Sequence, residues 1–240
     1  MTRILLMRGM LAGVVAGLLV FALACSIGEP QVERAIAFET AMHRAMGEPP
    51  EPVIVSRRIQ KSLGLLTATV VDGTAMGGIF ALVFAFAYGR LPVANPRALS
   101  ALLAGLGFVT LAVVPALKYP ANPPSVGTPE TIGVRTGAFF LLIAFSVVAM
   151  VLAVKVERRL HQRLGDWNAS LVAVVLFIIV IAGASHFLPN FNEVPQGFPV
   201  TLMWKFRVAA LEMQVVLWSV LGFFFGWLAD RSFTTQHLHG

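Results

Sequence analysis

The sequence predicts an all-α integral membrane protein, a bundle of about six transmembrane helices with a short amphipathic surface helix after the first span. Six apolar stretches are each about as long as the ~20 helical residues that cross a ~30 Å hydrocarbon core. Hydrophobic residues make up 57% of the chain and charged residues 12%, against ~25% charged in soluble domains. The stretches are Leu5–Ser26, Leu63–Tyr88, Ala98–Leu117, Val134–Val154, Ala169–Phe187 and Val208–Leu228.

The segments between these spans are too short for a soluble domain, so residues 1–240 are expected to form a single membrane domain. The net charge is +6, but the basic residues gather at the ends of spans, which indicates membrane orientation rather than nucleic-acid binding. Short cytoplasmic loops carry an excess of Lys and Arg. The strongest basic cluster therefore predicts a cytoplasmic N-terminus, and it consists of Lys155, Arg158, Arg159 and Arg163.

The first span carries glycines four residues apart, Gly9, Gly13 and Gly17, on one helical face. Such a stripe of small residues lets the backbone of another helix approach closely. An alternative is a cleaved signal segment, because Ala22–Cys25 has the small-residue pattern of a cleavage site. Cleavage would leave five spans, whereas the glycine stripe favours retention.

The outer polar segment, residues 27–62, contains an expected amphipathic helix over Pro30–Met46. Pro49, Pro50 and Pro52 would end it. We expect this helix to lie on the outer membrane surface.

The second span combines a close-packing face, Gly73 and Gly77, with a carboxylate, Asp72. An ionised group inside a span costs ~2.5–3.5 kcal/mol on insertion scales unless it faces a partner or water. Asp72 is therefore either a functional group, or a residue that is protonated or caps a bent helix, and the sequence leaves both open.

Two proline-rich loops, Lys118–Arg135 and His186–Arg207, are both expected on the outer side. Prolines make them stiff. Asn122 in the first loop and Glu193 in the second are candidates to face an ion. A rigid connector is the alternative for the first loop.

The last span holds Glu212 and Met213 near its outer end. Glu212 either pairs with Arg207 or Arg135, which would make it structural, or belongs to a cation path. With a single cysteine, Cys25, the chain offers imidazole, carboxylate, amide and thioether ligands, which suit cobalt or nickel. The candidate metal ligands are His186, Glu193, Asp72, Glu212, Met213 and Asn122.

No phosphate-binding loop and no Gly-x-Ser-x-Gly motif occurs, so we expect neither an enzyme nor a permanently bound cofactor. The segments Leu117–Thr136 and Leu188–Pro199 resemble the two signatures of the CbtA family of cobalt transporter subunits. Further likeness at Arg8–Gly17, Gly28–Pro30 and Ser56–Gln60 extends the resemblance over essentially the whole chain.

The resemblance implies a multi-pass protein of the bacterial inner membrane that supplies cobalt for cobalamin synthesis, with Co²⁺ as the transported ion. It implies about five spans and a small single-span partner, CbtB, with a histidine-rich end. Membrane lipid and a second copy of the chain are further expected partners, and nucleic acid is not. A non-transporting scaffold is the alternative function, in which glycines build the helix contacts and the proline-rich loops dock a partner.

Overall fold

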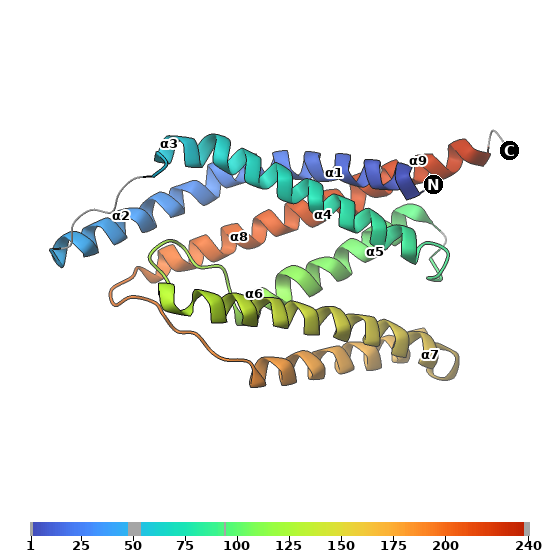
Figure 1. Cartoon of the computed structure of the whole chain (residues 1–240). Helices are drawn as coiled ribbons and strands as arrows, with labels where there is room; N and C mark the ends of the chain where they lie inside the picture. The colour runs from blue at the N-terminus through green and yellow to red at the C-terminus, as the bar shows by residue number, and fades with distance from the viewer. Residues whose placement is uncertain (1, 48–53, 94, 238–240) are drawn as a thin grey trace. The chain divides into compact units, whose positions relative to one another are not determined.

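The computed structural model describes residues 2–47, 54–93 and 95–237, and no strand occurs within these ranges. The expected breakers Pro49, Pro50 and Pro52 lie outside the described residues. The helical elements run in the following order (Figure 1): α1 Thr2–Leu23, η1 Ala24–Gly28, α2 Glu29–Ala45, α3 Arg57–Ile59, η2 Gln60–Gly64, α4 Leu65–Ala87, α5 Pro96–Phe108, η3 Val109–Val113, α6 Val114–Lys118, η4 Pro129–Thr131, α7 Ile132–Phe187, α8 Val200–Val220, η5 Leu221–Phe225 and α9 Gly226–His237.

Five helices of the described chain are long and apolar enough to cross a membrane: Thr2–Ala45, Arg57–Ala87, Pro96–Lys118, Pro129–Phe187 and Val200–Ser232. Six separate spans are not confirmed, because the expected fourth and fifth spans both lie within α7. The α7 backbone leaves the helical region at Gly165, which has φ 72° and ψ 169°. Figure 1 shows the ribbon of α7 reversing near its label, so α7 consists of two arms.

The expected surface helix is not confirmed as a separate element. α1 continues through one π-helical segment, η1, directly into α2, and the helical run covers 44 residues. Pro30 has no N–H to donate to the turn before it, and the wider π turn lies just ahead of this residue. A proline that normally marks a helix start is thus accommodated inside a longer helix.

The chain divides into two compact units. Unit 1 comprises Met1–Gly107, Pro123–Ser125 and Phe198–Gly240, and unit 2 comprises Phe108–Asn122 and Val126–Gly197.

In unit 1, α1 and α4 are in backbone contact along their glycines. A Cβ added to Gly13 would lie 2.0 Å from the carbonyl oxygen of Gly73, and one added to Gly77 would lie 2.1 Å from the carbonyl oxygen of Gly9. Only glycine permits this approach, so the predicted packing role of both glycine faces is confirmed. The two faces pack against each other.

The end of the last long helix packs on α5 and α4. A Cβ on Gly222 would lie 2.9 Å from the Cβ of Ala104, so this glycine also sits in a close contact. The ring of Phe225 lies edge-on to the rings of Phe80 and Phe84, with centroids 5.4 and 5.2 Å away. This apolar cluster fixes η5, and therefore α8, within unit 1.

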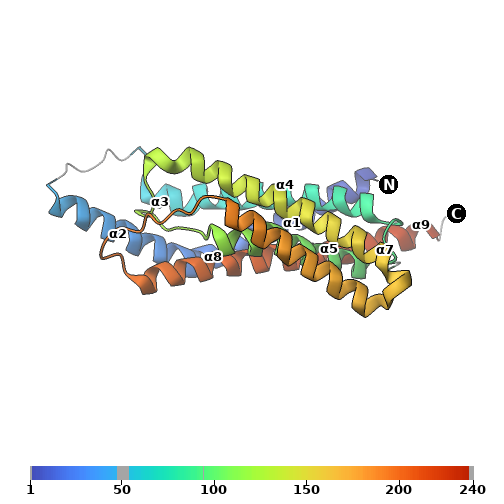
Figure 2. The same ribbon diagram turned by 90° about the horizontal axis from the view of Figure 1, so that it is seen from below.

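In unit 2, the two arms of α7 run side by side in both views (Figures 1 and 2). The buried positions of the first arm recur every three or four residues and mark one helical face: Ala138, Leu142, Ser146, Ala149 and Ala153. Mostly small side chains on this face allow close helix packing without a hydrophobic driving force.

Candidate functional site

Unit 2 brings the two proline-rich loops together. The hydroxyl of Tyr119 donates a hydrogen bond to the carbonyl oxygen of Pro189, at 2.7 Å. The ammonium of Lys118 donates to the side-chain oxygen of Asn190. The loops are therefore joined where each one leaves its helix.

Glu193 makes the most extensive link between the loops. The backbone N–H of Thr128 donates to the carboxylate oxygen Oε2 of Glu193 at 2.9 Å, and the Arg135 guanidinium lies 3.5 Å from the same oxygen. The Thr131 hydroxyl and the Thr128 N–H, assisted by the charge of Arg135, hold the pKa of Glu193 below its usual range. Glu193 therefore remains a carboxylate at neutral pH, with donors already on it.

Arg135 is held by the loop as well as by Glu193. Gly127 has φ 111°, a backbone conformation that favours glycine, and the Arg135 guanidinium packs directly against it. Arg135 also donates to the carbonyl oxygen of Thr128 at 3.4 Å. Of the two arginines considered for Glu212, Arg135 thus has Glu193 as its partner.

The other two candidates in unit 2 are on the surface. His186 is exposed at the end of α7, with its ring 5.4 Å from that of Phe187. Asn122 is exposed in the first loop. Within the described part of the chain, no three His, Cys, Asp or Glu side chains gather in a way that could hold a metal ion.

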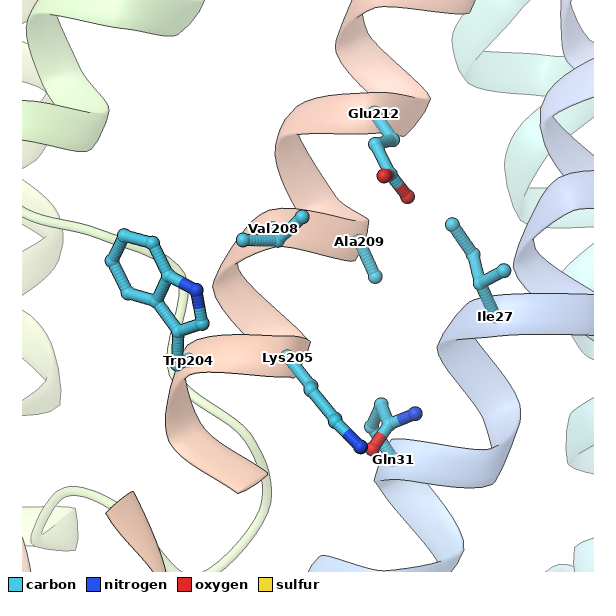
Figure 3. Close-up of a pocket in the computed structure, with 7 residues that line it drawn as sticks. All are labelled: Ile27, Gln31, Trp204, Lys205, Val208, Ala209 and Glu212. Atoms are coloured by element: carbon cyan, nitrogen blue, oxygen red, sulfur yellow. The ribbon is translucent and has the colours of Figure 1, made fainter. Parts of the chain in front are cut away.

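In unit 1, Glu212 lies in a groove of about 270 Å³ between η1–α2 and α8, lined by Ile27, Gln31, Trp204, Lys205, Val208, Ala209 and Glu212. Figure 3 shows the Glu212 carboxylate extending from α8 into the groove on the side of Ile27. The side chains of Lys205 and Gln31 extend toward the other end of the groove (Figure 3). Glu212 is exposed, and no described residue forms an ion pair or hydrogen bond with it.

Met213 and Asp72, the remaining candidates, have different surroundings. Met213 packs on η1, since a Cβ on Gly28 would lie 2.7 Å from the Met213 methyl group. Asp72 is exposed on α4 and likewise has no partner among the described residues. Its neighbour Gly73 faces α1. Asp72 and Glu212 are therefore two unpaired carboxylates on spanning helices.

Gln31 is the groove residue that the sequence analysis missed. Assigning Pro30–Met46 to a separate surface helix removed Gln31 from consideration. Lys205 and Glu212 are seven residues apart, a spacing that places two side chains on one helical face, and this pattern was visible in the sequence. The position of Gln31 depends on the continuation of α1 into α2, which no local signal gave.

The groove combines one carboxylate and one amide with apolar walls. A cation away from water needs such oxygen ligands, and carboxylate and amide oxygens bind divalent cations. Lys205 adds positive charge at the end beside Gln31, so a cation is favoured at the Glu212 end. The groove can therefore stabilise a cation in passage with one formal negative charge.

These features define a multi-pass membrane protein whose spanning helices expose polar groups toward a groove. The chain matches, over residues 2–230, the family described as "Probable cobalt transporter subunit (CbtA)", and it belongs to that family. No curated protein and no solved structure matches the chain.

Proposed function

We propose that the chain is the membrane subunit of a bacterial cobalt uptake system that supplies cobalamin synthesis. In this proposal it spans the inner membrane six times, each arm of α7 being one crossing, with the N-terminus in the cytoplasm. The family and the apolar helices support a membrane subunit of a transport system. Co²⁺ is the transported substrate, not a resident cofactor.

The observation that carries the proposal is the unpaired carboxylate of Glu212 in the groove on α8. A charge within a span costs ~2.5–3.5 kcal/mol on insertion scales, and such residues are retained at substrate and ion pathways. A passing cation would offset this cost and would be stabilised in return. Gln31 lines the other end of the groove, and its amide oxygen accepts a hydrogen bond from Arg34 at 3.3 Å, so the cation would rely on the Glu212 carboxylate.

The other candidate ligands take different parts in this proposal. His186 and Asn122, exposed near the loops, meet the metal first, and Asp72 provides a second carboxylate on a spanning helix. Met213 lies next to Glu212 in sequence but packs on Gly28, so its thioether is a ligand only after side-chain movement. Glu193 binds metal only if the ion displaces Arg135 and Thr128, and we assign it to holding the loops.

The test is radiolabelled cobalt uptake in a bacterial strain without its other cobalt importers. Glu212→Gln is expected to lower uptake to the background, because the amide keeps the shape and removes the charge. Glu130→Gln, at an exposed loop carboxylate, is the matched control and should transport normally. Wild-type uptake in Glu212→Gln and in Asp72→Asn, with membrane insertion verified for both, would refute this cation path.

A small single-span subunit with a histidine-rich end, of the CbtB type, is the proposed partner. Uptake is expected to require its coexpression. The alternative is a non-transporting scaffold, in which the glycines build helix contacts and the proline-rich loops dock a partner. Glycine packing within unit 1 is compatible with both functions. The two functions are distinguished by measuring cobalt inside vesicles that contain the purified chain and its partner. A transporter would accumulate cobalt in the lumen, whereas a scaffold would not.

A further inference from the structure

The tip of the α7 hairpin carries a dense basic surface. Four cations lie within nine residues of its first arm, and all are exposed: Lys155, Arg158, Arg159 and Arg163. None of their side chains has a hydrogen bond or ion pair with any residue that the structure describes. This surface, called the basic face below, plays no part in the groove or in the joined loops.

The four cations share one side of the helix. At about 100° per residue they occupy an arc of about 140°, and Glu157 points to the opposite side. Basic residues distributed around the whole circumference of a helix would form an ordinary solvated surface. These four lie on one side and therefore present a continuous positive strip to a single partner.

The strip lies where the helix leaves the bilayer. The apolar stretch Val134–Val154 has 21 residues, about 30 Å at 1.5 Å each, which equals the hydrocarbon thickness. Lys155 follows at once, and Arg163 comes two turns later. Side chains of a helix lean toward its N-terminus. On this arm they therefore lean back toward the membrane and bring the guanidinium groups to the headgroup layer.

The turn beyond the strip supports the same placement. Trp167 is 76% exposed and lies two residues before Ala169, where the apolar stretch of the second arm begins. Exposed tryptophan is typical of the membrane–water interface. His161 Nδ1 lies 2.5 Å from the Asp166 carboxylate, so this contact ties the two sides of the turn at Gly165 without involving the four cations.

We propose that the basic face binds the phosphate headgroups of anionic phospholipids in the leaflet around it. Clusters of four or more Lys and Arg beside a spanning helix attract anionic lipids, with about 1 kcal/mol per residue near the surface. A favourable interaction with the helix dipole is another reason for basic residues near a helix C-terminus, but it acts only within the last turn. It therefore explains Arg163 but not Lys155. The proposal is independent of the cobalt pathway.

The experiment compares lipids retained by the full chain. The chain is reconstituted in vesicles of equal parts phosphatidylglycerol and phosphatidylcholine, extracted in mild detergent, and its bound lipid is quantified by mass spectrometry. One cation corresponds to about fivefold in lipid affinity. Because four cations contribute, we expect phosphatidylglycerol to be enriched well over tenfold on the wild-type chain. The triple variant Arg158→Gln, Arg159→Gln, Arg163→Gln leaves only Lys155 and should lower the enrichment to about fivefold or less.

Two further variants separate charge from fold. The Arg44→Gln, Arg58→Gln, Arg34→Gln variant removes the same charge from exposed residues of α2 and α3 and should keep the enrichment. The variant Arg158→Lys, Arg159→Lys, Arg163→Lys keeps the positive charge and should retain most of the phosphatidylglycerol enrichment. All chains must elute as a single species before lipid is measured.

The proposal is overturned if the α7 triple glutamine variant retains as much phosphatidylglycerol as the wild type, or if the α2–α3 control loses as much. It is also overturned if about 1 M salt, at which the Debye length is about 3 Å, leaves the enrichment unchanged during extraction. An acidic protein that co-purifies through the three arginines, without lipid enrichment, would assign the basic face to that protein instead.

Discussion

Replacing Gly13 by alanine tests whether unit 1 depends on backbone contact between α1 and α4. The added Cβ would lie 2.0 Å from the Gly73 carbonyl oxygen. A carbon–oxygen contact normally needs about 3.3 Å. The helices must therefore separate by roughly 1.3 Å at this point, because a backbone carbonyl cannot rotate away as a side chain can.

The expected loss of stability follows from two opposing effects. Overpacking costs about 1–3 kcal/mol, and the rigid backbone places Gly13→Ala near the upper end of this range. Alanine recovers up to about 1 kcal/mol through its higher helix propensity. The net loss is about 2 kcal/mol, or about 4–8 °C in Tm for a chain of this size.

The assay is thermal unfolding in detergent, followed by size-exclusion chromatography of the fraction that remains monodisperse. Gly105→Ala in α5 is the control, because a Cβ there meets nothing within 4 Å. It should leave Tm unchanged or raise it, since only the propensity gain remains. If Gly13→Ala proves as stable as Gly105→Ala, the backbone contact between α1 and α4 is not a determinant of the fold.

Three further predictions concern the joined loops and the groove. Because the folded pKa of Glu193 lies below 4.5, its carboxylate stabilises the fold above that pH and loses this effect as the pH falls through the folded pKa. The Tm values of wild type and Glu193→Gln should therefore differ at pH 7 and converge below about pH 4.5. Tyr119→Phe removes the hydrogen bond to Pro189 and should lower the free energy of unfolding by about 1 kcal/mol in denaturant titrations, whereas an unchanged value would mean that the loops are held elsewhere. Glu212→Gln, the variant expected to lose cobalt uptake, should have a higher Tm than the wild type in thermal unfolding. A lower Tm would mean that Glu212 stabilises the fold.

The glycine faces could be predicted from the sequence because their spacing is local. Gly9, Gly13 and Gly17 repeat every four residues, and such a repeat needs no knowledge of the partner helix. That α4 is this partner, with Gly73 and Gly77 opposite, depends on the tertiary arrangement. The sequence therefore identified both surfaces without pairing them.

Helix boundaries were predicted less well than the glycine faces, because a residue such as Pro30 or Gly165 can either end a helix or lie within a longer helical run. Pro30 was interpreted as a helix start, yet the π turn before it lets one helix continue from α1 into α2. Gly165 lies in a basic link that sequence reasoning treated as a connection between two spans. The helical run of α7 continues up to this residue, and only its φ of 72° breaks it.

The candidate site was predicted by residue type but not by pairing. Glu193 was proposed as a metal ligand because it is a carboxylate in a stiff loop. The Thr128 N–H and Arg135 reach it from another loop far away in sequence, and no spacing rule reveals such contacts. Glu212 was left between pairing with an arginine and a cation path. Within the described chain it has no partner, which favours the second interpretation.

The unpaired state of Glu212 distinguishes function from stability. A structural carboxylate in a spanning helix is retained because its partner offsets the cost of desolvation, and its removal leaves that partner unsatisfied. Glu212 has no such partner among the described residues, so a neutral amide removes a cost without creating another. Natural proteins keep such unfavourable groups where activity requires them, and neutralising them trades activity for stability. The opposite signs expected for uptake and for Tm therefore follow from one geometric fact, the carboxylate that α8 holds in the groove beside Ile27 (Figure 3).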